Sequence, residues 1–258
     1  MSKPVSALTN SPAGIASQLR LAANFLTILP LGAGRTDNAI VAASFRWFPL
    51  VGFFLGAIFA FEDRLLLMVF PPLLGSVLVI LTMVVVTGAV HLDALADTAD
   101  ALGAGRNRDR ALEILRDSRV GSFGAAAICF SLALKIFALG SLHGPYRILA
   151  LFVAPGLSRW AMVAVAAGVQ YLRPEGGAGA TLLQRDTSSM MVASVIAAAL
   201  VIVTFSPRAL VSAALAIAVV LAARWFYRQW LGGVTGDLIG ACGEVVEIAV
   251  LVLFAASR

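Results

Sequence analysis

The sequence predicts an all-α fold, a polytopic bundle of membrane-spanning helices that forms one domain over residues 1–258. Two observations of composition predict it: the mean hydropathy is +0.93, and only 13% of the residues are charged. The third is the length of the apolar runs, several of which approach the roughly 20 residues that a helix needs to cross a bilayer. Soluble folds are therefore excluded, and neither an internal repeat nor a linker divides the chain.

Seven apolar segments are predicted to span the membrane, and six or eight spans are also compatible with the pattern. They are residues 48–69, 73–90, 121–142, 148–170, 190–206, 208–223 and 239–256. Their ends are uncertain by about four residues. The first contains three adjacent charged residues at 62–64, which favours a helix that ends there. The segment 19–31 is too short to span and is expected to be interfacial or re-entrant.

Alternating spans would place most of the polar chain on one side of the membrane. The N-terminal segment and residues 91–120, 171–189 and 224–238 would all emerge on the same face. That face would carry 13 of the 19 basic residues. Because cytoplasmic loops are enriched in Lys and Arg, we expect this face to be cytoplasmic. For any single arginine in a loop, the simplest interpretation is that it sets the orientation of the protein or contacts a lipid headgroup.

Residues 91–124 concentrate acids and bases within an otherwise apolar chain. Asp93, Asp97 and Asp100 are four and then three residues apart, so a helix would place their carboxylates within an arc of roughly 60°. Carboxylates this close repel each other unless a cation lies between them, and Mg²⁺ prefers oxygen ligands. A solvated helix face is the alternative, but the Ala, Leu and Thr residues between the aspartates lack its alternating charges. The spacing therefore favours a magnesium site.

Several ionisable residues fall within predicted spans, where a charge is costly. Arg159 lies near the middle of the fourth span, so it is expected to have an anionic partner. Lys135 lies nearer the end of its span, where it could snorkel or take a functional role. Glu244 and Glu247 begin the last apolar run, and Glu244 lies on nearly the same helical face as Asp237. The available cations are Arg159, Lys135 or a metal ion, and a buried structural ion pair is the alternative to a functional site.

Glycine-rich turns precede two of the predicted spans. Residues 117–124 join a charged helix to the next apolar run, with a glycine on each side of a Ser-Phe pair. Backbone N–H groups at a helix N-terminus bind anions, and Arg119 could add a bidentate phosphate contact. Such turns are also common punctuation before helices. The turn at residues 232–237, which contains Thr235, repeats the arrangement near the C-terminus.

Two further features lie on the same predicted face. The stretch 171–177 closes a span with proline and glycine, and its Arg173 and Glu175 offer a phosphate contact or a substrate hydrogen bond. His91 stands just before the first aspartate. A lone histidine is usually structural, yet one beside carboxylates at a membrane surface could serve as a base or as a ligand.

Seven stretches of the sequence carry a family resemblance. They are NFLTILPLG (24–32), WFPLVGFFLG (47–56), TGAVHLDALADTADAL (87–102), LEILRDSRVGSFG (112–124), SRW (158–160), YLRPEGG (171–177) and GGVTGDLIGACGEVVE (232–247). In this order they resemble the cobalamin synthase family, the adenosylcobinamide-GDP ribazoletransferases, over nearly all of the chain. The family pattern usually has glycine where Ala94 and Ala101 stand here, a departure that affects the local backbone and leaves every carboxylate in place.

The resemblance implies a Mg²⁺-dependent transferase that completes the nucleotide loop of cobalamin. An α-ribazole or its 5′-phosphate would attack the phosphate attached to adenosylcobinamide, and GMP would leave. The candidate metal ligands are Asp93, Asp97 and Asp100, with Asp237 and Glu244. The candidate phosphate or substrate contacts are Arg119, Arg159, Arg173, Lys135, Glu175 and Thr235. The candidate general bases are His91 and Asp117.

Other classes of membrane protein share some of these features. CDP-alcohol phosphotransferases and aromatic prenyltransferases also present aspartate-rich helices and Mg²⁺ to a diphosphate, but their Asp-Gly-x-x-Ala-Arg and Asn-Asp openings do not occur here. A polytopic transporter is suggested by the ionisable residues within spans, although its usual internal repeat is missing. The expected partners are the two substrates and the lipid bilayer, with no nucleic acid, and a homo-oligomer is compatible with the sequence.

Overall fold

The computed structural model describes residues 12–32, 38–105, 107–117, 119–172 and 187–256. Over these residues the chain is helical, apart from turns, loops and one isolated bridge between Tyr171 and Val234. The helices are α2 (Pro12–Leu26), α3 (Asn38–Ser44), the 3₁₀ helix η1 (Phe45–Trp47), α4 (Phe48–Leu66), α5 (Pro72–Val86), α6 (Val90–Leu102), α7 (Arg108–Ile114), α8 (Ser122–Ser141), α9 (Gly144–Ala166), α11 (Thr187–Ile202), α12 (Pro207–Trp230) and α13 (Gly236–Ala256). The all-α fold is confirmed.

All seven predicted spans form helices, but two of these helices are short. By length and composition, five helices of the described part can each cross a membrane: Ala39–Leu66, which combines α3, η1 and α4, and then α8, α9, α12 and α13. α5 and α6 qualify only as a pair bent by 86°, which is either a broken span or a re-entrant loop. α11 is apolar but has only 16 residues. The protein is therefore a multi-pass membrane protein. Its described part contains five or six full-length spans, and six lies within the predicted range of six to eight.

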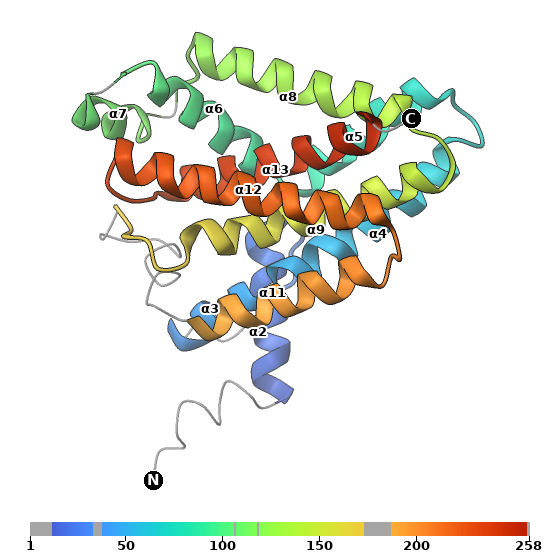
Figure 1. Ribbon diagram of the computed structural model, residues 1–258, viewed down its shortest axis with the longest axis horizontal. Coiled ribbons are helices and arrows are strands. Elements are labelled where there is room, and N and C mark those ends of the chain that lie inside the picture. Colours follow the sequence, from blue (N-terminus) through green and yellow to red (C-terminus); the bar gives the residue numbers. More distant parts are fainter. Residues whose placement is uncertain (1–11, 33–37, 106, 118, 173–186, 257–258) are drawn as a thin grey trace.

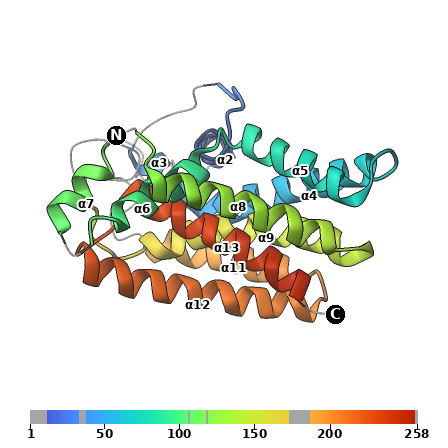
Figure 2. The ribbon, with the colours of Figure 1, turned by 90° about the horizontal axis from the view of Figure 1, so that it is seen from above.

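The long helices lie side by side, so that their ends gather at two opposite ends of the bundle (Figures 1 and 2). One end, on the left of Figure 1, gathers α7, the N-terminal ends of α8 and α13, and the C-terminal ends of α6, α9 and α12; we call it the α7 end. α2 crosses the long helices at a steep angle, near the bend between α5 and α6 (Figures 1 and 2). The described parts of segments 91–120, 171–189 and 224–238 therefore meet at one end of the bundle, as predicted. The N-terminal segment was expected there too, but its helix α2 lies near the bend between α5 and α6.

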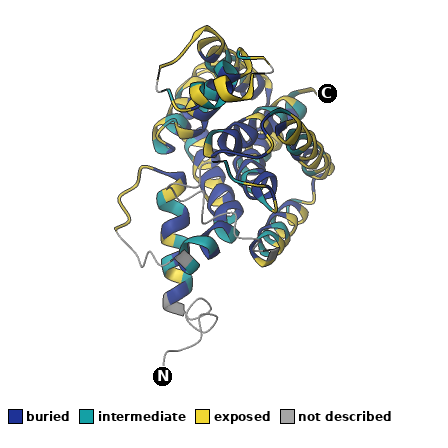
Figure 3. Ribbon diagram, turned by 90° about the vertical axis from the view of Figure 1, so that its left-hand side faces the viewer, coloured by how far each residue is buried: buried dark blue, intermediate teal, exposed yellow. Residues whose placement is uncertain are grey.

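α9 and α13 form the centre of the bundle, and α8 and α12 lie on its flanks. Of the most apolar part of each helix, 72% is buried in α9 and 67% in α13, against 28% in α8 and 22% in α12. Figure 3, which looks along the long helices, shows this buried centre and the exposed outward faces. In a bilayer the apolar outward faces of α8 and α12 contact lipid.

α4 packs closely against α9 through two glycines four residues apart. A Cβ atom at Gly52 would lie 2.5 Å from the carbonyl oxygen of Pro155, and one at Gly56 would lie 2.6 Å from that of Leu151. Small residues at this spacing let two membrane helices approach to backbone contact. The second of the seven motifs therefore determines how closely α4 approaches the central helix.

A buried ion pair joins four helices at the end of the bundle opposite α7. Arg147, at the start of α9, donates hydrogen bonds to both carboxylate oxygens of Asp63 on α4, at 2.8 and 2.7 Å. It also donates to the carbonyl oxygen of Leu139 on α8 at 2.6 Å and to Ser76 Oγ on α5 at 2.9 Å. The charged run at residues 62–64 therefore lies in the last turns of α4, as predicted.

A sharp bend separates α5 from α6. Gly88 and Ala89 both adopt the left-handed conformation, with φ of 62° and 57°, and this conformation is unfavourable for alanine. The N–H of Ile28, just after α2, donates to the carbonyl oxygen of Val86 at 2.9 Å. The predicted span 73–90 therefore stops at Val86, and the chain that follows α2 is anchored at the bend.

Candidate active site

The three aspartates of the sequence motif lie on one face of α6, as their spacing predicted. Asp93 is exposed, and Asp97 and Asp100 are half-buried. Another face of α6 carries buried Ala94 and Ala101 and packs against α13 and α8. Alanine in place of the usual glycine at these two positions is thus accommodated within a continuous helix. We call the surface formed by Asp93, Asp97 and Asp100 the acid face.

Asp100 caps the start of α8. Its carboxylate oxygens accept hydrogen bonds from the backbone N–H groups of Gly121 and Gly124, at 2.7 and 2.8 Å. A helix N-terminus favours a negative charge at this place. The glycine-rich turn is therefore an anion site, as predicted, but the anion it binds is a carboxylate of the protein. A Cβ atom at either glycine would overlap the Asp100 carboxylate, so both positions require glycine.

We expect Gly124→Ala to destabilise the protein, although alanine normally favours a helix. The added methyl group would displace the Asp100 carboxylate and leave N–H groups of α8 without their acceptor, at a cost of about 1–2 kcal/mol. Thermal unfolding in detergent measures the change. Ser122→Ala, at an exposed neighbouring position, is the matched control, and a Gly124→Ala variant as stable as this control would contradict the assigned cap.

Asp237 lies at the same end of the bundle as the acid face. α6 and α13 run in opposite directions (Figure 1), and a Cβ atom at Gly240 would lie 2.7 Å from that of Ala94. Asp97 follows Ala94 by three residues on α6, and Asp237 precedes Gly240 by three residues on α13. Because a helix rises 1.5 Å per residue, both aspartates lie about one turn from the contact, toward the α7 end.

Thr235 is fully buried at the start of α13. Its Oγ1 accepts a hydrogen bond from the N–H of Leu238 at 3.3 Å and lies 3.2 Å from Asp237 Oδ2. These contacts cap the helix. Thr235 is therefore a helix cap in this structure, and its predicted phosphate contact stays a prediction.

The described residues contain no group of three His, Cys, Asp or Glu side chains placed to hold a metal ion. Asp100 is directed to α8, and Glu244 is buried in an ion pair. Asp93 and Asp97 lie on α6, and Asp237 lies in the first turn of α13. Mg²⁺ usually keeps several waters and binds one or two carboxylates together with substrate phosphates. The chemistry of these carboxylates is compatible with Mg²⁺ that a substrate diphosphate would share, and the predicted magnesium site stays a prediction.

Asp117 and Arg119 form an exposed ion pair in the turn between α7 and α8. Arg119 Nη2 lies 2.6 Å from Asp117 Oδ2. Hydrogen bonds from the Arg119 side chain and backbone N–H lower the pKa of Asp117 to about 2. A carboxylate with so low a pKa is a weak base at neutral pH, so Asp117 is a poor candidate for the general base. The Arg119 side chain is 87% exposed and remains accessible to a phosphate.

The shifted pKa of Asp117 predicts how this pair responds to pH. Because the folded-state pKa lies below the ordinary value of 3.8, the pair stabilises the protein above that value and its contribution is lost as the pH falls toward 2. We therefore expect Asp117→Asn to leave the shape of the pH profile of turnover unchanged between roughly pH 5 and pH 9. Asp109→Asn, on exposed α7, is the control. Loss of an acid limb in Asp117→Asn alone would instead make Asp117 the base.

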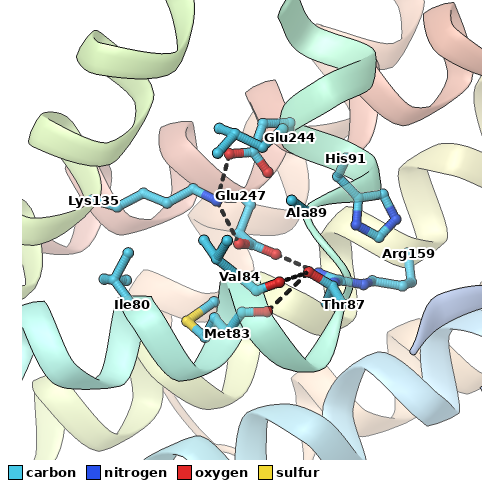
Figure 4. Close-up of a pocket in the computed structure, with 11 residues that line it drawn as sticks. Ile80, Met83, Val84, Thr87, Ala89, His91, Lys135, Arg159, Glu244 and Glu247 are labelled. Carbon is cyan, nitrogen blue, oxygen red and sulfur yellow. Dashed lines mark hydrogen bonds and ion pairs between the residues drawn. The ribbon is translucent and has the colours of Figure 1, made fainter. Parts of the chain in front are cut away.

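Four charged side chains meet in a buried cluster at the centre of the bundle (Figure 4). Glu247 on α13 accepts a hydrogen bond from Lys135 on α8 at 2.8 Å and forms an ion pair with Arg159 on α9. Glu244, one turn earlier on α13, has its Oε1 2.6 Å from Lys135 Nζ. Two carboxylates balance two cations, so these four residues are together neutral. We call them the charge cluster.

The charge cluster gives three candidate site residues a structural role. Arg159, Lys135 and Glu244 expose only 2%, 5% and 4% of their surface. The cavity beside them has a volume of about 20 Å³, which suits a water molecule rather than a nucleotide. Arg159 has the anionic partner that its position predicted. In this structure the three side chains form the buried ion pairs that the sequence left open as the alternative. The phosphate contacts at Arg159 and Lys135 and the metal ligand at Glu244 stay predictions.

His91 is directed away from the acid face. It is only 5% exposed and lines the cavity beside the charge cluster, and Figure 4 shows its ring close to Arg159. At 100° per residue, His91 lies about 180° around α6 from Asp100. A side chain on that side of the helix does not reach a substrate bound at the acid face. The position of His91 therefore does not support its expected role as the general base.

The chain after α9 pairs with the turn before α13. The N–H of Leu172 donates to the carbonyl oxygen of Val234 at 2.9 Å, and the N–H of Val234 donates to that of Gln170 at 2.8 Å. Two candidate site residues, Arg173 and Glu175, follow directly and lie outside the described residues. The paired segments bring two of the sequence motifs together at the α7 end.

Glu247 has the cationic partners that the sequence offered, because it pairs with both Lys135 and Arg159. Another residue has a role that the sequence pattern did not single out. Arg108, counted among the loop arginines, donates from Nε to the carbonyl oxygen of Leu231 at 2.8 Å and anchors α7 beside the end of α12. No sequence signal indicates that contact, because the two residues are 123 positions apart.

The fold and the distribution of charge define a multi-pass membrane protein with a group of carboxylates on the acid face of α6 and an exposed Asp117–Arg119 pair in the turn after α7. The family described as Cobalamin-5-phosphate synthase matches residues 18–255. The chain belongs to this family, and the resemblance carried by the seven motifs is confirmed.

Similar proteins carry the name adenosylcobinamide-GDP ribazoletransferase. The one from Syntrophobacter fumaroxidans is 41% identical over 242 residues, which are 91% of this chain and 96% of that protein. Those from Desulforamulus reducens and Bradyrhizobium diazoefficiens are 38% and 36% identical, over 92% and 96% of this chain and 95% and 96% of their own lengths. No solved structure matches the chain.

Proposed function

We propose that this protein is an adenosylcobinamide-GDP ribazoletransferase, which joins adenosylcobinamide-GDP to α-ribazole or α-ribazole 5′-phosphate and releases GMP. The observation that carries the proposal is the family match over residues 18–255. Relatives of that name align with more than nine-tenths of this chain and of their own lengths. The activity they are named for is therefore proposed for the whole chain.

The reaction is a phosphoryl transfer to an alcohol. A hydroxyl oxygen of the ribazole forms a bond to the phosphorus attached to adenosylcobinamide, and the bond from that phosphorus to GMP breaks. GMP leaves with the bonding electron pair, and the hydroxyl proton passes to a base. Such a transfer depends on in-line positioning and on neutralising phosphate charge more than on covalent help from the protein. The acid face and the exposed Arg119 place suitable groups at one end of the bundle.

Five residues of the acid face and its neighbouring turns have a proposed role. Asp93, Asp97 and Asp237 would hold Mg²⁺, which when bound neutralises and orients the diphosphate. Arg119 would bind phosphate oxygens with its guanidinium group. Asp100 would keep the acid face beside Arg119, because it joins α6 to the turn that carries this arginine.

The proposed location is the bacterial cytoplasmic membrane, with the α7 end in the cytoplasm. The support is the excess of basic residues in the segments that meet there. A site at this end would receive both substrates from the aqueous side, so a large corrinoid would not need to enter the bilayer. The transporter alternative loses its main support, because the ionisable residues of α8, α9 and α13 pair with one another.

The proposal is tested by incubating purified protein in nanodiscs with adenosylcobinamide-GDP, α-ribazole 5′-phosphate and Mg²⁺, and measuring released GMP. We expect release that requires the protein and stops when EDTA removes the metal. Release that continues in EDTA would overturn the metal assignment alone. No release from protein that unfolds cooperatively on heating would overturn the proposed function.

A further inference from the structure

We infer that His91 and the charge cluster are positioning groups, which hold α6 so that the acid face is placed for the transfer reaction. This inference rests on the proposed function, because the acid face is the part of that site whose placement is at issue. None of these groups would touch the substrate.

α6 cannot take its position from the helix that precedes it. The bend of 86° and the two left-handed residues Gly88 and Ala89 interrupt the backbone between α5 and α6. Across the bend the backbone bonds are irregular, with the N–H of Ala89 donating to the carbonyl oxygen of Val84 at 2.9 Å and that of Val90 to Thr87 at 3.4 Å. The orientation of the acid face is therefore set by the groups against which α6 packs.

The first turn of α6 rests on the charge cluster. His91 is buried in this turn and shares a cavity with Lys135, Arg159, Glu244 and Glu247. Within the described structure, His91 Nε2 has no hydrogen-bond partner, and the cavity volume of about 20 Å³ leaves room for a bridging water molecule. The cluster itself joins α8, α9 and α13, three helices that cross the full bundle. α6 is thus supported by a rigid part of the fold.

His91, which contacts the cavity beside the charge cluster, and the acid face lie on different sides of α6. On a helix His91 is about 160° from Asp93 and about 120° from Asp97 around the axis. A change beneath His91 would therefore rotate or shift α6 and move the aspartates without contacting them. A displacement of about 1 Å at a reacting group can cost on the order of 100-fold in rate.

The far end of α6 supplies a reporter of its position. Asp100 accepts hydrogen bonds from the N–H groups of Gly121 and Gly124. These amides are protected from hydrogen exchange only while α6 keeps its orientation. Their exchange rates measure the placement of α6 without any substrate or metal ion.

The experiment compares wild type with Glu247→Gln and with His91→Gln, in nanodiscs. Glu247→Gln removes one charge of the charge cluster. His91→Gln leaves the four charges of the cluster intact, so it tests the same role with less risk that the variant fails to fold. We expect exchange at Gly121 and Gly124 to increase at least about fivefold in both variants. We also expect the Mg²⁺ concentration for half-maximal GMP release to rise at least about fivefold, and kcat to fall by about 10- to 100-fold.

Asp63→Asn is the matched control, because it weakens a buried ion pair at the other end of the bundle. It is expected to lower thermal stability without changing exchange at Gly121 and Gly124 or the Mg²⁺ dependence. If Glu247→Gln and His91→Gln behave like this control, the cluster is merely structural and the inference is overturned. If wild type releases no GMP, the proposed function fails. The positioning role is overturned separately if Gly121 and Gly124 exchange at the wild-type rate in both variants.

Discussion

Asp97→Asn reduces the rate of GMP release by about 1,000-fold or more, while the helical bundle remains folded. Asp97 lies between the exposed Asp93 and the capping Asp100 on the acid face, about one helical turn from the contact between α6 and α13. An amide lacks the negative charge that binds a hard cation, and stabilisation of the transferred phosphate by a metal ion is worth several kcal/mol. At 1.36 kcal/mol per factor of ten, a loss of about 4 kcal/mol gives this reduction.

The measurement is the initial rate of GMP release at saturating substrates, with thermal unfolding of the same preparation. Glu113→Gln is the control, because Glu113 is an exposed acid on α7 that pairs with Arg110 and lies outside the acid face. We expect its rate to stay within a factor of about two of wild type. If Asp97→Asn kept its rate and its response to EDTA, the acid face would not be the metal site.

Arg147→Met lowers the free energy of unfolding by about 3–5 kcal/mol, the largest loss of stability that we expect from a single substitution away from the acid face. Arg147 is only 2% exposed, and its guanidinium group is the partner of both oxygens of the Asp63 carboxylate. Methionine fills part of the same volume but leaves the carboxylate buried without a cation. Reversible unfolding in mixed micelles measures the effect.

The double variant Asp63→Leu with Arg147→Met separates charge from packing. Removing both charged partners leaves neither one uncompensated, and replacing a buried pair by apolar residues is often neutral. We expect the double variant to recover at least about half of the stability lost in Arg147→Met. A double variant less stable than either single variant would show that the hydrogen bonds of Arg147 to α5 and α8, rather than its charge pairing, hold this end of the bundle.

The sequence allowed the helical fold and the acid face to be predicted because both depend on local periodicity. Apolar runs of span length identify membrane helices from composition alone, and the four-and-three spacing of Asp93, Asp97 and Asp100 places them on one face of any helix. Arg159 was also predicted to have an anionic partner, since the cost of an unpaired charge within a span applies in any fold.

The features that were not predicted depend on contacts between distant segments. The bend after Val86 was not predicted, because it requires a left-handed alanine, Ala89, and lies beside the distant Ile28, whose N–H donates to the carbonyl oxygen of Val86. The turn with Gly121 and Gly124 was considered as a phosphate site, but its N–H groups bind the Asp100 carboxylate, a contact between segments that sequence spacing does not reveal. Residues 173–186 lie outside the described structure, so Arg173 and Glu175 stay predictions.

The most direct test measures GMP and the corrinoid product in the same reaction, with each substrate omitted in turn. If the protein transfers the cobinamide phosphate to ribazole, GMP and the completed nucleotide loop will form in a one-to-one ratio, and each will require both substrates and Mg²⁺. GMP formed at an equal rate without ribazole would mean hydrolysis rather than transfer, and the absence of both products from folded protein would contradict the proposed function itself.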